Sequence, residues 1–131
     1  MGKSVSLPLM TCAVQAGFSS AADEHIETFL DLNKLFVKHP AATFFVRVSG
    51  NSMHQAGIVS GDILVVDRAL TPADGKIVVA LLNGEFTVKK LVMRHNRVKL
   101  VAANPRYPEL EITEESDFRV WGVVTHVIHQ C

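Results

Sequence analysis

"KIVVALLNGEFTVKKLVMR", residues 76–94, is the stretch that decides the fold of this chain. It consists of two β-branched, apolar runs separated by Asn83-Gly84. This dipeptide is the strongest short signal for a β-hairpin, because its tight turn requires positive φ at both central residues. Residues 76–82 and 85–94 are therefore predicted to form two paired antiparallel strands.

Further runs of the same kind continue on both sides of this hairpin, all of them after Pro40. They read TFFVRVS, DILVVDR, RVKLVAA, LEI and FRVWGVVTHVIH. Turn dipeptides such as Thr71-Pro72, His95-Asn96 and Asn104-Pro105 separate them. The sequence predicts a mainly β fold, a single domain of bent antiparallel sheets with about seven strands.

The segment before Pro40 has a different pattern. Ser20 suits a helix N-cap, and Asp23 suits the first turn of that helix. Apolar residues follow at roughly helical spacing, at Ile26, Phe29, Leu30, Leu35 and Phe36. We expect a short helix before Pro40, although Asp31 and Asn33 interrupt its apolar stripe. Residues 1–16 are expected to form a flexible arm.

Composition sets limits on the class of protein. A chain of 131 residues with 48% hydrophobic content suits one domain with a real core. Thirteen basic and thirteen acidic residues cancel, so overall charge does not indicate a polyanion binder or a membrane-surface protein. Cys12 and Cys131 lack the spacing of a metal site or disulfide framework, which favours a reduced, cytoplasmic compartment without metal or cofactor. No apolar run is long enough to span a bilayer.

The N-terminus, MGKSVSLPLMTCAVQA, matches three targeting signals only weakly. A secretory leader requires a continuous apolar region, and Ser6, Pro8 and Thr11 interrupt this one. A lipoprotein signal requires small residues before Cys12, whereas Met10 and Thr11 stand there. The match of MGKSVS to a myristoylation signal is short and carries little information.

A candidate nucleophile, Ser52, lies in VSGNSMHQAG, where the pattern leaves strand periodicity just after Gly50. Glycine permits a sharp turn that can present a hydroxyl beside free backbone N–H groups, but a serine in such a turn more often caps it. The pattern is not the G-x-S-x-G elbow, because His54 stands in place of glycine.

Ser52 needs a base, and His54 is too close in sequence to turn onto it easily. His126 and His129 have odd separation, which places them on opposite faces of a strand and argues against a metal pair. A lysine can serve if burial keeps it partly neutral. Lys89 and Lys90 lie on opposite faces of one apolar strand, and periodicity does not choose between them.

Six motifs in their order resemble the LexA/UmuD family of self-cleaving serine/lysine proteins, and within it the UmuD branch. They are AVQAGF, DLNKLFVKHP, VSGNSM, GIVSGDILVVD, GEFTVKKL and GVVTHVI, and they extend from about residue 13 to residue 127. The resemblance implies Ser52 as nucleophile, Lys89 as general base and a cut between Ala16 and Gly17. It divides the chain into a cleavable arm, 1–16, and a LexA/UmuD-like peptidase domain, 17–131.

The resemblance also implies partners and a role. These are a homodimer, a RecA filament on single-stranded DNA that promotes cleavage, and a UmuC-like Y-family polymerase subunit that the shortened form assists in error-prone translesion synthesis. UmuD itself has cysteine before the scissile glycine, whereas this chain has Ala16, as LexA-like relatives do. Ala56-Gly57 repeats the cut dipeptide but is expected to be a turn.

Three other functions share some of these features. A LexA-type or phage-type repressor needs a DNA-binding domain ahead of the cut, and sixteen residues precede Gly17. A non-catalytic β-domain that binds a polymerase partner would not need Ser52 and Lys89, and a signal peptidase needs a membrane anchor. Direct DNA contact is expected to be weak or indirect, because the basic residues Lys89, Lys90, Arg94, Arg97 and Lys99 on one hairpin suit a solvated face. Trp121 is expected to pack and not to stack on a base.

Overall fold

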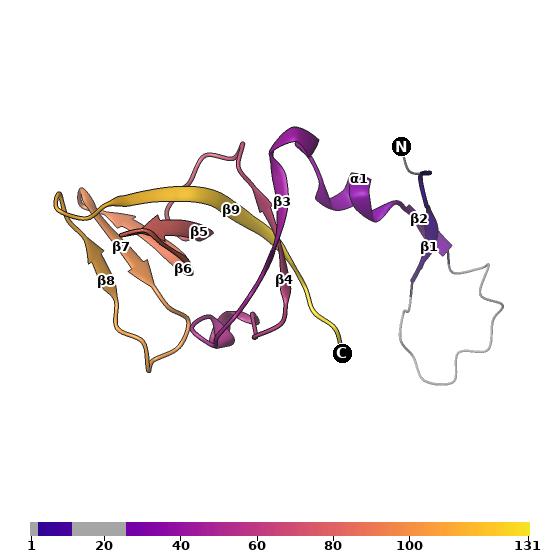
Figure 1. Cartoon of the computed structure of the whole chain (residues 1–131). Coiled ribbons are helices and arrows are strands. Elements are labelled where there is room, and N and C mark those ends of the chain that lie inside the picture. Colours follow the sequence, from indigo (N-terminus) through magenta and orange to yellow (C-terminus); the bar gives the residue numbers. More distant parts are fainter. Residues whose placement is uncertain (1–2, 12–25) are drawn as a thin grey trace. The chain divides into compact units, whose positions relative to one another are not determined.

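The computed structural model of the chain describes residues 3–11 and 26–131. The chain divides into two compact units, Met1–Lys38 and His39–Cys131, which are considered one at a time (Figure 1). The domain boundary expected between residues 16 and 17 lies outside the described residues.

The larger unit contains one seven-stranded sheet, in the order β3-β4-β9-β5-β6-β7-β8. The strands are β3 (Thr43–Arg47), β4 (Ile63–Asp67), β5 (Ile77–Leu82), β6 (Glu85–Arg94), β7 (Arg97–Val101), β8 (Leu110–Ile112) and β9 (Phe118–Ile128). Two 3-10 helices, η2 (Pro40–Ala42) and η3 (His54–Ala56), accompany them. Every neighbouring pair is antiparallel, so the mainly β, antiparallel prediction is confirmed.

The central hairpin forms as its turn chemistry dictates. Strands β5 and β6 pair from Ile77 opposite Lys90 to Leu82 opposite Glu85. Asn83 and Gly84 have φ of 50° and 83°, the positive values that a two-residue turn of this kind requires. The predicted strand pair is therefore confirmed.

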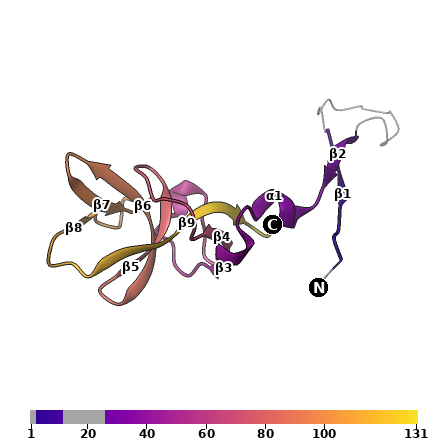
Figure 2. The same ribbon diagram turned by 90° about the horizontal axis from the view of Figure 1, so that it is seen from above.

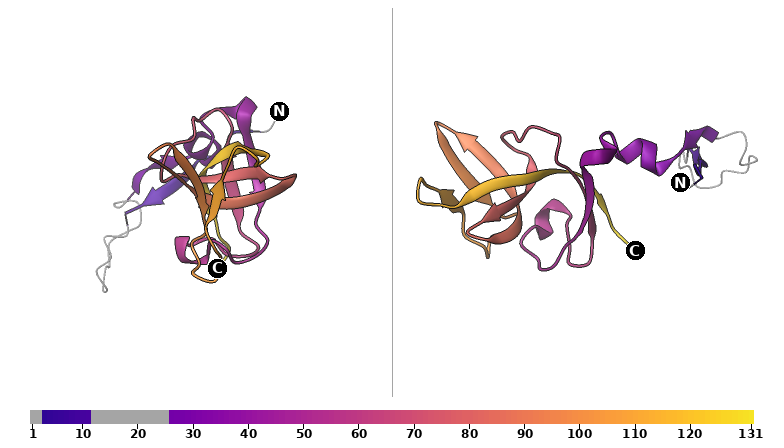
Figure 3. Two further views of the ribbon diagram at one scale, coloured as in Figure 1. Left: turned by 90° about the vertical axis from the view of Figure 1, so that its left-hand side faces the viewer. Right: turned by 45° about the horizontal axis from the view of Figure 1, so that its top comes forward.

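Strand β9 lies between β4 and β5 and joins the two parts of the sheet. Its first half pairs with β5 and its second half with β4. The register shifts once in each ladder, so that Trp121 and Thr125 have no opposing residue. Such bulges bend a strand and increase its twist. The sheet is bent accordingly, with β5 and β6 running across the direction of β3 and β4 (Figures 2 and 3).

Both faces of the central strand β5 are buried, which explains its unbroken apolar sequence. Val79 belongs to one hydrophobic cluster, with Met53, Ile58, Leu64 and Val66. Val78 and Ala80 point the other way, into a second cluster with Leu91, Leu100 and Val123. Met53 directly follows the candidate nucleophile, so the first cluster anchors the chain at Ser52.

Buried carboxylates stand at both ends of β4. Asp62, 3% exposed, accepts hydrogen bonds from the Val59 N–H and from His129 Nδ1, and these two bonds hold its pKa below the ordinary value. Asp67, 4% exposed, is 2.6 Å from His39 Nδ1, and this contact is the main cause of its lowered pKa. A buried charge is tolerated only when it is paired in this way. Each pair therefore fastens an end of the unit to β4.

The smaller unit differs from the expectation in two respects. Ile26–Leu30 form strand β2, not part of a helix, and Leu7–Met10 form strand β1 in the segment expected to be a flexible arm. The two strands pair antiparallel, from Leu7 opposite Leu30 to Met10 opposite Ile26. The prediction failed because the partner strand, which local spacing does not reveal, supplies the backbone hydrogen bonds, and Ile26 and Thr28 are β-branched.

A helix does precede Pro40, but it is α1 (Leu32–Phe36), which is only five residues long. Asp31 accepts a hydrogen bond from the Asn33 N–H and is the N-cap. Asp31, which interrupts the apolar stripe of the predicted helix, is thus the residue that caps the start of the observed helix. The start predicted at Ser20 and Asp23 lies outside the described residues.

Candidate active site

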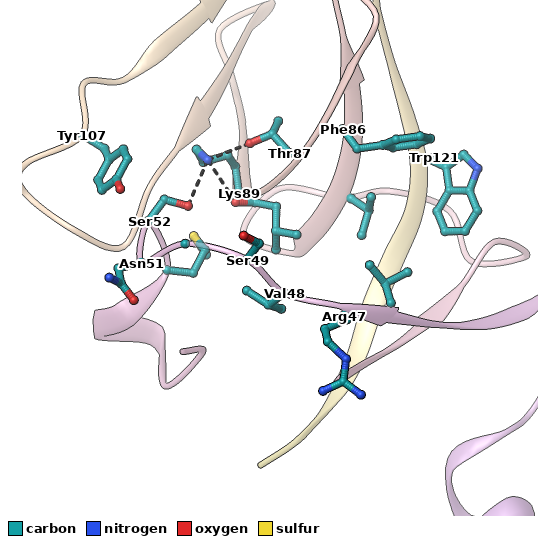
Figure 4. Close-up of a pocket in the computed structure, with 15 residues that line it drawn as sticks. Arg47, Val48, Ser49, Asn51, Ser52, Phe86, Thr87, Lys89, Tyr107 and Trp121 are labelled. Atoms are coloured by element: carbon teal, nitrogen blue, oxygen red, sulfur yellow. Dashed lines mark hydrogen bonds between the residues drawn. The ribbon is translucent and has the colours of Figure 1, made fainter. Parts of the chain in front are cut away.

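A groove of about 520 Å³ opens in the larger unit beside the end of β3 (Figure 4). One wall is the chain from Val46 to Met53, and the other comes from Phe86 to Lys89 of β6. Trp121 of β9 lines one end, and Tyr107 of the β7–β8 loop lies near Ser52 (Figure 4). The groove therefore joins segments that are far apart in the sequence.

Ser52 is placed by the turn that ends β3. Gly50 has a φ of 94°, a conformation that L side chains rarely adopt. The chain reverses there and leads through Ser52 into η3, while the side chain of Met53 is buried in the core. The serine hydroxyl consequently faces the groove and not the solvent on the far side of the loop (Figure 4).

Lys89 extends into the same place from β6 and is 8% exposed. Its Nζ donates to Ser52 Oγ at 3.1 Å, to Thr87 Oγ1 at 2.7 Å and, more weakly, to the Val88 carbonyl at 3.3 Å. All three acceptors are neutral, and no ion pair of Lys89 occurs within residues 3–11 and 26–131. Burial without a counter-ion lowers the pKa of Lys89 below 10.5, because it disfavours the ammonium form.

The structure separates the two lysines that the strand pattern left equivalent. Lys90 is exposed on the opposite face of β6, whereas Lys89 points into the groove. Thr87, on the same face as Lys89, contributes a contact that the sequence analysis did not assign. Strand alternation predicted that Thr87 and Lys89 share one face of β6. The sequence did not reveal that this face lies next to Ser52.

Phe86 and Trp121 form an aromatic surface in the groove. Their ring centroids are 5.8 Å apart in an edge-to-face arrangement, and Phe44 lies 5.2 Å from Trp121. Arg68 donates from Nε to the Trp121 carbonyl, and its guanidinium carbon is 4.6 Å from the centre of the ring. These contacts agree with the expectation that Trp121 packs.

The other candidate residues have different surroundings. His126 contacts Thr125, and His129 contacts Asp62. The described part of the chain contains no cluster of three or more metal-binding side chains. Ala56-Gly57 ends η3, with Gly57 at a φ of 80°, so this second Ala-Gly is a turn as expected. Ala16 and Gly17 lie outside the described residues.

The basic residues of the β6–β7 hairpin do not form a continuous track. Lys89 is buried in the groove, Arg94 lies 3.9 Å from Asp74, and Lys99 lies 3.3 Å from Glu109. Acidic partners offset the attraction of such residues for phosphate. Among the helices that the structure describes, none has the length and apolar character to cross a membrane.

Comparison with known proteins decides the family. Residues 8–125 match the Peptidase S24-like family, which is most of the chain and includes the whole groove. The chain belongs to this family. The S24 family comprises self-cleaving serine peptidases, and this chain is a UmuD-like member of it.

Curated S24 relatives agree with this assignment. Protein ImpA of Escherichia coli is 47% identical over 123 residues, covering 94% of this chain and 83% of the relative. Protein MucA of Escherichia coli is 44% identical over 122 residues, covering 92% and 83%. The LexA repressor of Photorhabdus laumondii is 37% identical over 123 residues, covering 93% of this chain and 60% of the repressor.

Proposed function

We propose that this S24 protein cleaves its own chain between Ala16 and Gly17, with Ser52 as the nucleophile and Lys89 as the general base. The observation that carries the proposal is the 3.1 Å contact between Lys89 Nζ and Ser52 Oγ, in a groove where the amine has no acidic partner among the described residues. A base must lie within hydrogen-bond reach of the proton that it removes. A lysine can act as a base only when burial lowers its pKa.

The proposed chemistry has two halves. Neutral Lys89 takes the proton of Ser52 Oγ, and the oxygen attacks the carbonyl carbon of Ala16. The tetrahedral intermediate collapses when the Lys89 ammonium gives that proton to the departing nitrogen of Gly17. A water molecule, deprotonated by Lys89, then attacks the ester carbonyl. The bond to Ser52 Oγ breaks, Lys89 returns the proton to that oxygen, and the C-terminal carboxyl group of Ala16 is released.

Small residues at the cut suit this groove. Ala16 requires little space. Gly17 has no Cβ that could clash with the groove as the extended chain approaches. The fifteen residues 11–25 that connect β1 to β2 contain the proposed cut. Cleavage would therefore separate two strands that pair in the intact chain.

The proposed role is in the SOS response to DNA damage. A RecA filament on single-stranded DNA promotes the cut, and the shortened homodimer serves a UmuC-like Y-family polymerase in the cytoplasm. Resemblance to the UmuD branch supports this role, and the S24 relatives ImpA and MucA are consistent with it. A slow basal reaction suits such a switch, because only the neutral fraction of Lys89 is reactive.

Incubation of the full chain with a RecA filament, followed by mapping of the new N-terminus, tests this function. We expect a product that begins at Gly17 from the wild type and none from Ser52→Ala or Lys89→Met. Mixing wild type with Ser52→Ala tests whether one chain cuts another, because only cleavage by a second chain removes the arm of the variant. A mixture of Ser52→Ala and Lys89→Met is the negative control, because neither chain has an intact Ser52–Lys89 pair. An intact wild-type chain under these conditions would favour a non-catalytic binding module.

A further inference from the structure

We propose that Asn104 is a positioning residue that orients the peptide group between Asn51 and Ser52, so that the Ser52 N–H faces the developing oxyanion. This inference rests on the proposed self-cleavage. Asn104 lies in the β7–β8 loop, 52 positions along the chain from Ser52, and nothing in the sequence pattern connected the two.

The Asn51 carbonyl oxygen, at one end of that peptide group, accepts two hydrogen bonds, a longer one from the His54 N–H at 3.2 Å and a shorter one from Asn104. Asn104 Nδ2 donates to the Asn51 carbonyl oxygen at 2.9 Å. The same peptide group carries the Ser52 N–H at its other end. Because a trans peptide is planar, its C=O and N–H point in opposite directions. A donor that holds the carbonyl on the loop side therefore aims the Ser52 N–H away from the loop.

The Ser52 N–H is available for this task. Like the N–H of Met53, it donates to no acceptor among the described residues, whereas the N–H groups of His54, Gln55 and Ala56 all have backbone partners. An unpaired N–H beside a nucleophilic oxygen is the donor that an oxyanion requires, provided that its direction is fixed in advance.

Asn104 is itself held in one orientation. Its Oδ1 accepts from the Arg106 N–H at 3.0 Å, and its backbone carbonyl accepts from the Tyr107 N–H. A flipped side-chain amide would put oxygen against the Asn51 carbonyl oxygen and would lose the bonds to Asn51 and to the Arg106 N–H. The amide therefore presents its donor, and not its acceptor, to the Asn51 carbonyl.

Two further bonds bind the same loop to the segment that carries Ser52. The Gln55 N–H donates to the Ala103 carbonyl at 2.7 Å, and the Ala103 N–H points to Met53 Sδ at 3.3 Å. These bonds fix the residues after Ser52, whereas the Asn104 bond fixes the peptide group before it. Removal of the Asn104 donor thus leaves the loop attached and leaves the Asn51 carbonyl with only the longer bond from the His54 N–H among the described residues.

Asn104→Asp and Asn104→Leu in the full chain test the proposal. Asp keeps the size and the acceptor for Arg106 but replaces the donor by an oxygen, and Leu removes the donor without adding charge. Asn83→Asp is the matched control, because Asn83 also accepts from a backbone N–H, that of Asp117, and lies on an exposed turn that does not line the groove. Self-cleavage is followed from pH 6 to pH 10.5, with circular dichroism to confirm folding at the assay temperature.

We expect both Asn104 variants to lower the limiting alkaline rate by about tenfold to a hundredfold, as for a weakened oxyanion donor. The pH of half-maximal rate should stay at the wild-type value in Asn104→Leu, because the burial of Lys89 does not change. A peptide boronic acid that ends in the analogue of Ala16 should inhibit both variants less well, by a similar factor, since its tetrahedral adduct uses the same N–H. Asn83→Asp should cleave at the wild-type rate.

A wild-type limiting rate in folded Asn104→Leu would overturn the proposal, and so would a slower rate with unchanged boronic acid inhibition. Failure of the wild type to cleave at all would instead overturn the proposed function. The wild-type control separates the two cases.

Discussion

Lys89 Nζ lies 3.1 Å from Ser52 Oγ, although 37 positions separate the two residues along the chain. One is on a strand of the central hairpin, and the other follows the turn at the end of an edge strand. The bent sheet brings them together in a groove where every partner of the amine that the structure describes is neutral. Both the proposed chemistry and its cost in stability follow from this arrangement.

Replacement of Lys89 by methionine should stabilise the fold while abolishing cleavage. Burial lowers the pKa of Lys89, so the unfolded chain binds its proton more tightly than the folded chain. This difference destabilises the folded wild type. The destabilisation has its full size below the pKa of Lys89 in the folded chain and decreases as the pH rises towards 10.5, the ordinary pKa of lysine. Thermal denaturation should show a gain of roughly several degrees for Lys89→Met at pH 7 and a smaller gain at pH 10. An equal or lower melting temperature at pH 7 would contradict a destabilising burial of the Lys89 amine without an acidic partner.

Thr87→Val should slow cleavage and shift its pH dependence. Valine keeps the shape but removes the hydroxyl that accepts from Lys89 Nζ at 2.7 Å. Because that bond favours the charged amine, its loss should lower the pKa of Lys89 further, and the rising limb of the rate should move to lower pH. The limiting rate should fall by about tenfold, since the amine is less well aimed at Ser52. A normal limiting rate at an unshifted pH would show that Thr87 has no part in the site.

Gly122→Ala should destabilise the sheet by about 1–3 kcal/mol, as overpacking of a core does. A Cβ at this position would be 2.5 Å from Val66 Cγ1, and Val66 is fully buried. Addition of Val66→Ala removes the clashing methyl groups. The double variant should therefore be more stable than the sum of the two single effects predicts, by urea denaturation. Simple additivity would mean that the backbone, not Val66, adjusts to the new methyl group.

The N-terminal fragment should leave after cleavage. Strand β1 has four residues and, within residues 3–11 and 26–131, pairs with β2 alone, and an isolated two-stranded sheet is marginal in water. Once the covalent connection is cut, pairing also loses the high effective concentration that the chain provides. Native mass spectrometry of the cleaved protein should find residues 17–131 without the fragment 1–16. Persistent co-migration of the fragment would indicate a stronger contact than this sheet.

Local chemistry was sufficient to predict the strands of the larger unit. Asn83-Gly84 favours a tight hairpin turn, and the β-branched runs on both sides of it favour the extended conformation of a strand. Strand β2 was missed for the opposite reason. Residues 26–30 become a strand because β1 supplies a partner, and no local pattern identifies a partner across fifteen intervening residues.

The candidate site also contains residues that the sequence could indicate and one that it could not. The sequence proposed Ser52 and two lysines, and family resemblance favoured Lys89, whose inward direction the structure now gives. Thr87 could have been suspected from its place on the face of Lys89. Asn104 could not, because its contact with the Asn51 carbonyl depends on how the β7–β8 loop folds over the groove.

The rate of self-cleavage as a function of pH tests the central claim most directly. The full chain, without any activator, is followed from pH 6 to pH 10.5, and the product is sequenced from its N-terminus. We predict a product that begins at Gly17 and a rate that rises about tenfold per pH unit until it levels off at the pKa of Lys89, which is below 10.5, with no product from Ser52→Ala. A rate independent of pH in the folded protein, or the same product from Ser52→Ala, would contradict a lysine base acting on Ser52.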